Sequence, residues 1–248
     1  MYTTRYVIGF IFILTASVAV GLTGLREVTK NKAAQNEDIF NKRAILSAIE
    51  DYLPDGKKVD NLSDQEVSLI FEKMEQPVLN MQGEAVNDVK AETIDMAKER
   101  KKPESERRLP LYIYEHNGEK FYILSVRGNG LWDEIWGNIA LKGDGNTIAG
   151  AAFDHKGETP GLGAEIKDNP SFPEQFQGKK IYDDGEFVSV KVRKGGAKDP
   201  EHEVDGISGA TVTSDGVTEM LYRGINYYQP FLKEIRQSEG TQGLLMQK

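Results

Sequence analysis

The stretch Val204-Asp205-Gly206-Ile207-Ser208-Gly209-Ala210-Thr211-Val212-Thr213-Ser214 lies between a strand-like run and a long amphipathic pattern. Mostly apolar residues then recur at helical spacing: Val217, Met220, Leu221, Gly224, Ile225, Tyr228, Phe231, Leu232 and Ile235. The stretch therefore predicts a small-residue loop that enters the N-terminus of a helix. Ser214 or Thr213 is placed to cap the first turn. Free N–H groups and the positive end of the helix dipole favour phosphate there.

The composition bounds the function classes. The chain has 248 residues, a net charge of −8 and no cysteine. The acidic balance argues against a nucleic-acid partner. Without cysteine there are no disulfides, thiolate nucleophiles or cysteine-ligated iron–sulfur clusters. The histidines, His116, His155 and His202, lack metal-ligand spacing, so we expect structural roles for them and no metal site.

The N-terminal segment Val7–Leu25 carries no charge and is long enough to span a hydrocarbon core. A cleaved signal peptide is the alternative, because Ser17-Val18-Ala19 resembles a small-residue cleavage site. The apolar run continues past that site and is long for a signal peptide. We therefore predict an uncleaved membrane anchor over residues 1–32.

Charges on either side of this segment leave its orientation open. Arg5 precedes it, whereas Arg26, Lys30 and Lys32 follow it. The positive-inside rule would keep the following domain in the cytoplasm. However, domains of this size are translocated largely regardless of flanking charge.

Residues 33–108 are predicted to form a helical stalk and linker. An apolar face over 33–52 predicts one helix, which the turn residues Pro54-Asp55-Gly56 end. A second helix is expected over 63–74, where Ser63 and Glu66 have capping-box spacing. The segment 75–108 is polar, and we interpret its basic residues as a solvated helix end and linker.

From Leu109 the pattern becomes strand-like, and residues 109–248 are predicted to form one domain. Asn117-Gly118 separates two apolar runs as in a β-hairpin. A second strand pair is expected over 135–141 and 147–153, and a further strand over 187–192. The fold class is therefore α+β, with a twisted, mostly antiparallel sheet closed by the helix over 217–235.

Three motifs occur in order: Gly128-Asn129-Gly130-Leu131-Trp132, then Gly157-Glu158-Thr159-Pro160-Gly161-Leu162-Gly163, then Asp205-x-x-Ser208-Gly209-Ala210-Thr211. Together they resemble the FMN-binding domains of the NqrC family, which belongs to the sodium-pumping NADH:quinone oxidoreductase. The resemblance covers about Arg127 to Ile235. The RnfG family of the related Rnf ferredoxin:NAD oxidoreductase is the alternative, because it shares the second and third motifs.

The resemblance implies covalent FMN, linked by a phosphoester to the Thr211 hydroxyl. A separate flavin transferase would install it, because a threonine alcohol is a poor nucleophile without an added base and metal. Asp205 would either shape the loop around Ser208, Gly209 and Ala210 or help to present the Thr211 hydroxyl. Further cofactor contacts expected from the resemblance are Leu131, Trp132, Glu158, Thr159, Leu162 and Gly163. Charge alone suggests Lys191 and Lys179 as partners of the phosphate.

By the same resemblance, the chain is a single-pass inner-membrane protein of a larger complex, with a periplasmic C-terminal domain. It would relay single electrons between partner subunits, from NADH oxidation toward quinone. It would not be active alone, and sodium would cross through partners because the anchor carries no intramembrane ionisable group. The alternative from another class is a membrane-tethered scaffold without redox chemistry.

Overall fold

The computed structural model describes residues 3–246, with side chains as far as residue 238. The chain divides into two units between Asn41 and Lys42. Helix α1 (Thr4–Ser47) supplies the described part of the first unit and the first residues of the second. Since the two units are separate bodies, each is described by itself.

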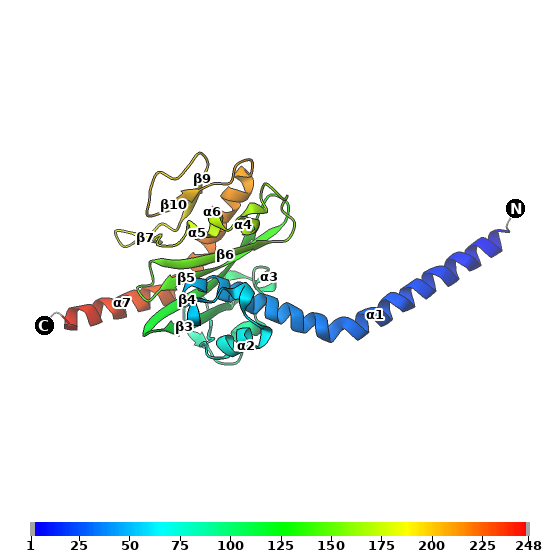
Figure 1. The fold of residues 1–248 in the computed structure, drawn as a ribbon, viewed down its shortest axis with the longest axis horizontal. Helices are drawn as coiled ribbons and strands as arrows, with labels where there is room; N and C mark the ends of the chain where they lie inside the picture. The colour runs from blue at the N-terminus through cyan, green and yellow to red at the C-terminus, as the bar shows by residue number, and fades with distance from the viewer. Residues whose placement is uncertain (1–2, 247–248) are drawn as a thin grey trace. The chain divides into compact units, whose positions relative to one another are not determined.

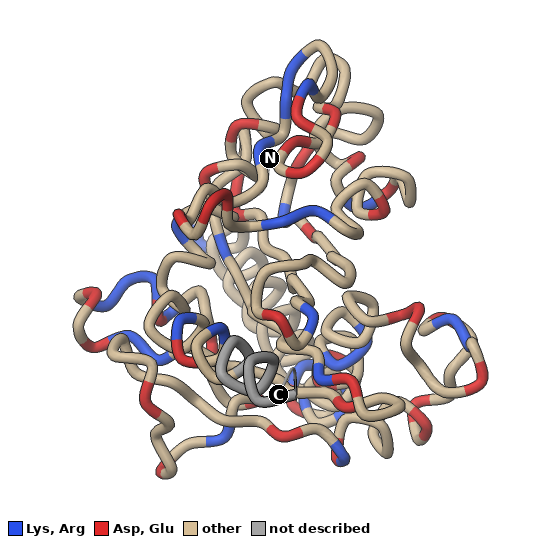
Figure 2. The backbone as a smooth tube through the Cα atoms, turned by 90° about the vertical axis from the view of Figure 1, so that its left-hand side faces the viewer, with Lys and Arg blue, Asp and Glu red and all other residues tan. Residues whose placement is uncertain are grey.

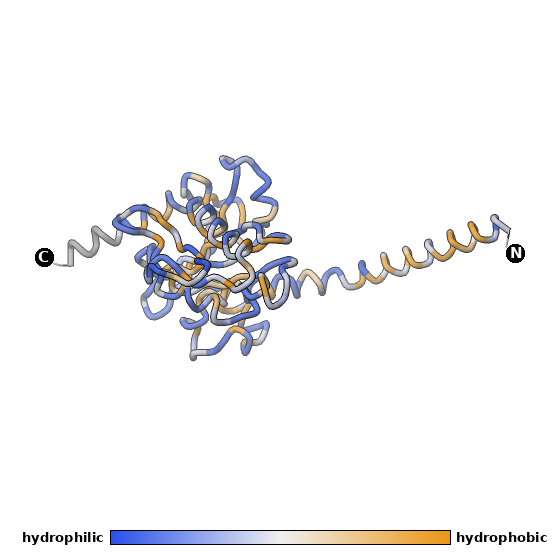
Figure 3. The backbone as a smooth tube through the Cα atoms, turned by 90° about the horizontal axis from the view of Figure 1, so that it is seen from above, coloured by the Kyte–Doolittle hydropathy of each residue, from blue (hydrophilic) through white to orange (hydrophobic). Residues whose placement is uncertain are grey.

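The first unit carries the candidate membrane span. Among the described residues, α1 is the one helix long and apolar enough to cross a membrane, as judged by length and composition. Figure 3 shows hydrophobic residues running along its N-terminal part. This helix contains the apolar segment Val7–Leu25, from which the anchor was predicted.

The second unit is built on a six-stranded sheet with the order β2-β1-β3-β4-β5-β6 (Figure 1). All its neighbouring strands are antiparallel, which confirms both predicted strand pairs. A register shift between Ala140 and Leu141 interrupts the pairing of β5 with β6. The strands are β1 (Val78–Leu79), β2 (Ala85–Val86), β3 (Leu109–His116), β4 (Glu119–Asn129), β5 (Glu134–Lys142) and β6 (Ile148–His155).

Helices and two small two-stranded sheets accompany the six-stranded sheet. This combination confirms the α+β fold class. The remaining helices are α2 (Asp64–Glu72), α3 (Met96–Glu99), α4 (Glu165–Asp168), α5 (Ser171–Glu174), α6 (Thr211–Tyr227) and α7 (Gln229–Met246). The remaining strands are β7 (Tyr182–Asp183), β8 (Glu186–Phe187), β9 (Lys191–Arg193) and β10 (Glu203–Asp205). Single 3-10 turns cover residues 50–52, 54–56, 59–61, 91–93 and 104–106.

The two faces of the sheet have separate cores, because side chains alternate along each strand. On one face, Leu111 and Leu124 pack in a cluster with Leu221 and Ile225 of α6. On the other face, Tyr112 and Ile123 belong to a cluster with residues that precede β1. That second cluster includes Ile45, Leu46, Ile49, Leu53, Val67, Phe71 and Met74.

The segment predicted as a stalk and linker, residues 33–108, therefore contributes to the core of the second unit from Lys42 onward. It supplies most of one hydrophobic cluster and strands β1 and β2. Each of these strands is two residues long, too short to show a period in the sequence. Within this segment, helix α2 and the capping box of Ser63 and Glu66 are confirmed.

The basic run of the same segment is balanced by acidic neighbours. Arg108 pairs with Asp88 at 3.2 Å, and Lys102 pairs with Glu99 at 2.7 Å. Figure 2 shows basic and acidic residues interspersed along the backbone. This distribution is typical of a solvated surface.

Two predicted elements are wrong in their extent. The strand predicted over 187–192 is broken, since Ser189 has a φ of 60° and only β8 and β9 flank it. The helix predicted over 217–235 begins earlier, at Thr211, and is interrupted at Tyr228 before α7 begins. Both breaks arise from backbone conformations that apolar periodicity does not encode.

Candidate functional site

The N-terminus of α6 is the centre of the candidate site. Thr211 is the first helical residue, and Ala210 occupies the N-cap without a side-chain hydrogen bond. Gly209 precedes them with a φ of 76°, a conformation that glycine adopts without strain. The first backbone N–H groups of any α-helix lack intrahelical acceptors, so those of α6 are available to a ligand. The hydroxyl-capped helix start predicted from Ser214 or Thr213 is therefore wrong.

The two predicted capping residues lie inside the first turns of α6 and have other partners. Ser214 Oγ accepts a hydrogen bond from the Ile207 backbone N–H at 3.3 Å. Thr213 Oγ1 donates to Glu158 Oε2 at 2.6 Å, and both residues are buried. The Thr213 bond joins the first turn of α6, just after the third sequence motif, to the second motif.

Glu158 also binds the first motif. Its Oε1 atom accepts from the Trp132 backbone N–H at 2.9 Å, and its own N–H donates to His155 Nδ1 at 3.1 Å. The residue is only 4% exposed and forms no ion pair with any described residue. One buried carboxylate thus joins the loops of the first two motifs to the first turn of α6, which follows the third motif.

Glu158 is ionised at neutral pH. Burial raises the pKa of this carboxyl, but hydrogen bonds from Thr213 and from the backbone N–H groups of residues 131–133 outweigh that effect. Its pKa therefore lies below the ordinary value. The negative charge is balanced by oriented dipoles, without a neighbouring cation among the described residues.

Glycines allow this close approach. A Cβ atom on Gly130 or Gly163 would collide with the carboxylate of Glu158. A Cβ on Gly216 of α6 would meet the Asn129 carbonyl oxygen, and one on Gly224 would meet the Val126 side chain. Helix α6 therefore rests directly on β4 and on the loop that follows it.

Large apolar side chains are exposed on these same loops. Trp132 is 68% exposed, and its Nε1 atom donates to Thr159 Oγ1 at 3.1 Å. Leu162 is also exposed, and its Cδ2 atom occupies the space next to the α-carbon of Gly209. Leu131 and Val212 complete the set of exposed apolar side chains on these segments. An exposed apolar set on two loops and the start of α6 indicates a binding surface.

Asp205 fixes neighbouring segments through its hydrogen bonds, and no described bond joins it to the Thr211 hydroxyl. Its Oδ1 atom accepts from the Ala197 N–H at 2.7 Å, while its own N–H donates to Gln175 Oε1 at 2.8 Å. Asp205 and Ser208 line a groove of about 440 Å³ together with Gly161, Glu165, Asn169, Phe172, Gln175, Gly206 and Ile207. The groove adjoins the loop that leads to Thr211.

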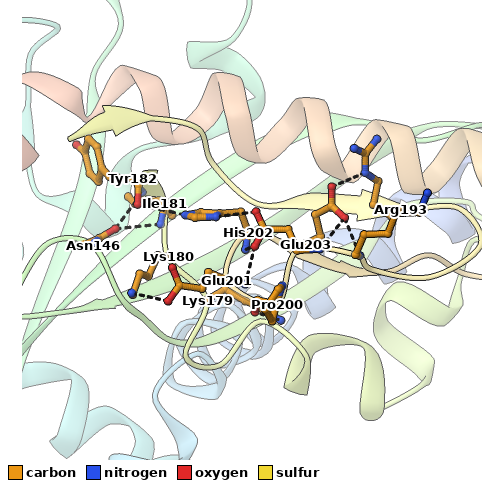
Figure 4. A network of polar contacts seen from close by, with 12 residues as sticks. Asn146, Lys179, Lys180, Ile181, Tyr182, Arg193, Pro200, Glu201, His202 and Glu203 are labelled. Carbon is orange, nitrogen blue, oxygen red and sulfur yellow. Dashed lines mark hydrogen bonds and ion pairs between the residues drawn. The ribbon is translucent and has the colours of Figure 1, made fainter. Parts of the chain in front are cut away.

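A polar network secures the strands that lead into this loop (Figure 4). Parallel strands β9 and β10 pair, and Arg193 Nε donates to Glu203 Oε1 at 2.6 Å between them. His202 bonds Asp199 through Nδ1 and the Tyr182 carbonyl through Nε2. Burial lowers the pKa of His202, but these two bonds raise it above the ordinary value overall.

The two lysines predicted to pair with phosphate have other neighbours in the structure, and their pairing with phosphate stays a prediction. Lys179 Nζ donates to the Pro200 carbonyl at 2.6 Å, within the network of Figure 4. Lys191 lines a groove with Asp215, Thr218 and Glu219 on the side of α6. Neither has a recorded contact with Thr211 among the described residues.

The structure adds Thr213 and Val212 to the site. The sequence analysis assigned Thr213 only as a helix cap. The signal it left unused is that this hydroxyl, two residues after Thr211, can also hydrogen-bond to a buried carboxylate. Glu158 and Gly163, also predicted as cofactor contacts, are buried and support the surface from beneath, and their contact with a cofactor stays a prediction. Leu131, Trp132, Thr159 and Leu162 remain predicted contacts.

A family model described as an FMN-binding domain matches residues 130–226, which include the second and third motifs. The NqrC subunit of the Na(+)-translocating NADH-quinone reductase from Vibrio vulnificus is 33% identical, with 94% of each chain covered. The Pseudomonas aeruginosa NqrC is also 33% identical, over 96% of this chain and 97% of the relative. The chain belongs to the NqrC family. This result agrees with the sequence analysis, in which the first motif favoured the NqrC family over the RnfG family.

Solved structures of NqrC share this fold. The crystal structure of the Parabacteroides distasonis NqrC aligns with a TM-score of 0.72 and 38% identity, over 82% of this chain and 96% of that one. The Shewanella oneidensis NqrC aligns with a TM-score of 0.66 and 26% identity, over 79% of this chain and 99% of that one. The NqrC family thus has the sheet and helices described above.

Proposed function

We propose that the chain is a membrane-anchored electron-transfer protein with FMN attached to Thr211 through a phosphoester. It serves as the NqrC component of a Na(+)-translocating NADH:quinone reductase. The FMN-binding domain match and the NqrC relatives support FMN and this complex. Attachment at Thr211 rests on one observation, the placement of this residue at the uncapped N-terminus of α6.

The residues present fit the phosphate of FMN. Thr211 is partly exposed, and its hydroxyl has no recorded hydrogen bond to another described residue. The N–H groups of the first turn of α6 and the helix dipole stabilise a phosphodiester anion at that position. Gly209 and the exposed Ser208 leave the backbone open to an incoming transferase.

The residues also fit a flat ring. Leu131, Trp132, Leu162 and Val212 offer apolar area beside Thr211, and Thr159 supplies a hydroxyl. When bound, FMN supplies reversible one- and two-electron chemistry. The chain holds the ring, limits its contact with water on one side and fixes the loops through Glu158.

A separate flavin transferase supplies the chemistry of attachment in this proposal. Among the described residues, no general base is hydrogen-bonded to the Thr211 hydroxyl. The carboxylate of Glu158 accepts hydrogen bonds from Thr213 and Trp132 instead. A threonine alcohol needs a general base and phosphate polarisation to react. Thr211 is therefore an acceptor that the transferase activates.

Attachment is tested by peptide mass spectrometry after expression of the full chain with and without a flavin transferase. One FMN mass should appear on the peptide that carries Thr211, only with the transferase. Thr211→Ala should be colourless and folded, whereas Thr211→Ser should retain some flavin because it keeps the hydroxyl. Modification of Thr213 or Ser214 instead would contradict the proposal.

We further propose that α1 anchors the chain in the inner membrane and that the second unit faces the periplasm. The apolar part of α1 and the membrane complex named for its relatives support the anchor. In right-side-out spheroplasts, added protease should remove the second unit. Its protection until the membrane is permeabilised would place it in the cytoplasm.

A further inference from the structure

The segment predicted as a linker supplies one arginine to the first motif. Arg100 follows helix α3, and its Nη1 atom donates to the Gly128 carbonyl at 3.0 Å. Both Nη1 and Nη2 also donate to Asn129 Oδ1 at 3.2 Å. Gly128 and Asn129 are the last two residues of β4. The guanidinium group of Arg100 therefore fixes the end of this strand.

The main chain of Arg100 is itself held in place. Its N–H donates to the Met96 carbonyl at 3.1 Å, and its carbonyl accepts from Arg107 Nη2 at 3.1 Å. The Nη1 atom of the same Arg107 donates to the hydroxyl of Tyr227, the last residue of α6, at 2.6 Å. The Arg100 side chain thus extends toward β4 from a segment that is bound to the C-terminal end of α6.

The turn that carries Leu131 and Trp132 begins directly after the acceptors of Arg100. A hydrogen bond from the Gly130 N–H to the Asp133 carbonyl, 2.8 Å long, closes this turn. Leu131 and Trp132 are both exposed, so no core packing orients them. Their direction depends mainly on how the main chain of the turn is held.

Two side chains of opposite charge hold that main chain. Glu158 accepts hydrogen bonds from the N–H groups of residues 131–133. Arg100 donates to the acceptors of residues 128 and 129, immediately before the turn. Hydrogen bonds that involve a charged group are stronger than neutral ones, and the planar guanidinium group restricts orientation as well as distance. The turn is therefore restrained on both its N–H side and its approach from β4.

We propose that Arg100 is a positioning residue for the FMN ring. It fixes the end of β4 and thereby the direction in which the turn presents Trp132 to the ring. This inference rests on the proposed function, in which FMN is attached to Thr211 with its ring against Trp132. Arg100 acts through the turn and not on the ring itself.

The test is the fluorescence lifetime of FMN attached to Thr211 in the full chain, coexpressed with a flavin transferase and placed in nanodiscs. A tryptophan that contacts a flavin quenches its fluorescence by electron transfer, so the short-lived fraction reports rings held against Trp132. Arg100→Met removes every donor and keeps the apolar stem. It should raise the ratio of long-lived to short-lived flavin about two- to tenfold, the equilibrium equivalent of one net hydrogen bond.

Arg108→Met is the matched control. Arg108 belongs to the same segment, and its side chain is 34% exposed against 33% for Arg100. It pairs with Asp88, which lies in none of the motifs, so its lifetime ratio should equal that of the wild type. In a Trp132→Phe background, Arg100→Met should leave the lifetime ratio unchanged, because the quenching side chain is absent.

A second variant reaches the same contact from its other side. Asn129→Ala removes an acceptor at an exposed position, so the chain should fold even if Arg100→Met does not. It should raise the lifetime ratio in the same direction. The double variant of Arg100→Met and Asn129→Ala should change the ratio by less than the product of the two single effects, because both remove one shared contact.

Peptide mass spectrometry of the same samples separates this inference from the proposed function. Flavin on Thr211 with one lifetime ratio in wild type, Arg100→Met and Asn129→Ala would overturn the positioning role alone. An equal rise in Arg108→Met, or a wild-type flavin without a short-lived component, would also overturn it. Wild type without flavin on Thr211 would overturn the proposed attachment and this inference together.

Discussion

Two buried carboxylates flank the stretch that leads to Thr211, and they are stabilised in different ways. Glu203 pairs with Arg193 and accepts the N–H groups of Lys198 and Asp199 at 2.9 and 3.2 Å. Glu158 accepts one hydroxyl and backbone N–H groups, without an ion pair to a described residue. Glu203 thus joins neighbouring segments, whereas Glu158 joins its own loop to the loop of Trp132 and to the first turn of α6.

The difference shows where the molecule depends on a single side chain. The partners of Glu203 have access to water, since Arg193 is 52% exposed, and they can be solvated if the carboxylate is lost. Thr213 is 1% exposed and would lose its only recorded acceptor if Glu158 were removed. Loss of the Glu158 carboxylate should therefore destabilise the fold more than loss of the Glu203 carboxylate.

The largest effect is expected from Glu158→Ala. It leaves the Thr213 hydroxyl and the Trp132 N–H unpaired, which should lower the free energy of unfolding by about 3 kcal/mol. Urea unfolding of the full chain measures this loss. Glu158→Gln keeps an acceptor oxygen and should cost clearly less; equal losses in both variants would show that charge, and not hydrogen bonding, dominates.

A smaller effect is expected from Glu203→Ala. Water can replace the carboxylate at its exposed partners, so the free energy of unfolding should fall by about 1–2 kcal/mol. The same urea titration provides the comparison. A loss larger than that of Glu158→Ala would reverse the ranking of the two networks.

The pH dependence of stability should separate the two regions. The lowered pKa of Glu158 gives stability that is present above its ordinary value of 4.5 and is lost as pH falls through the folded-state pKa. The raised pKa of His202 gives stability that is present below 6.5 and is lost as pH rises through its folded-state pKa. Unfolding measured from about pH 3 to 9 should therefore have a shallower acid slope in Glu158→Gln than in the wild type.

His202→Gln provides the matched variant for the alkaline side. Its unfolding free energy should change less between about pH 6 and 8 than that of the wild type. An unchanged slope in this variant would assign the alkaline loss to another group.

The smallest effect on stability is expected from Trp132→Ala. Because this side chain is 68% exposed, the free energy of unfolding should change by less than about 0.5 kcal/mol. The absorption and fluorescence of attached flavin should nevertheless change if the ring contacts Trp132. Leu69→Ala, at an exposed position of α2, is the control for loss of exposed apolar area away from this surface, and identical spectra in wild type and Trp132→Ala would remove Trp132 from the ring site.

Sequence periodicity predicted the parts of the fold with repeated local patterns. The hairpin at Asn117-Gly118 and the pairing of β5 with β6 follow from alternation and turn residues. Strands β1 and β2 were missed because two residues show no alternation. The left-handed backbone at Ser189 was missed because serine does not signal a positive φ.

The candidate site was predicted as motifs and not as contacts. The motifs located Thr211 and the loops that carry Trp132 and Leu162. The bond between Thr213 and Glu158 joins residues 55 positions apart, and no local pattern encodes such a distance. Lys191 was predicted as a phosphate partner from its charge alone, and charge does not determine where a side chain points.

The glycine contacts beneath α6 limit how far a group bound at Thr211 can move. With Gly216 against the Asn129 carbonyl and Gly224 against Val126, the helix has no space to slide toward β4. A group tethered to Thr211 therefore explores a volume set by its own rotatable bonds and not by movement of its support. That confinement raises its effective concentration at any acceptor docked against this surface. For FMN attached as proposed, the fold would thus set the position of the attachment point, and the tether alone would set the range of donor–acceptor distances.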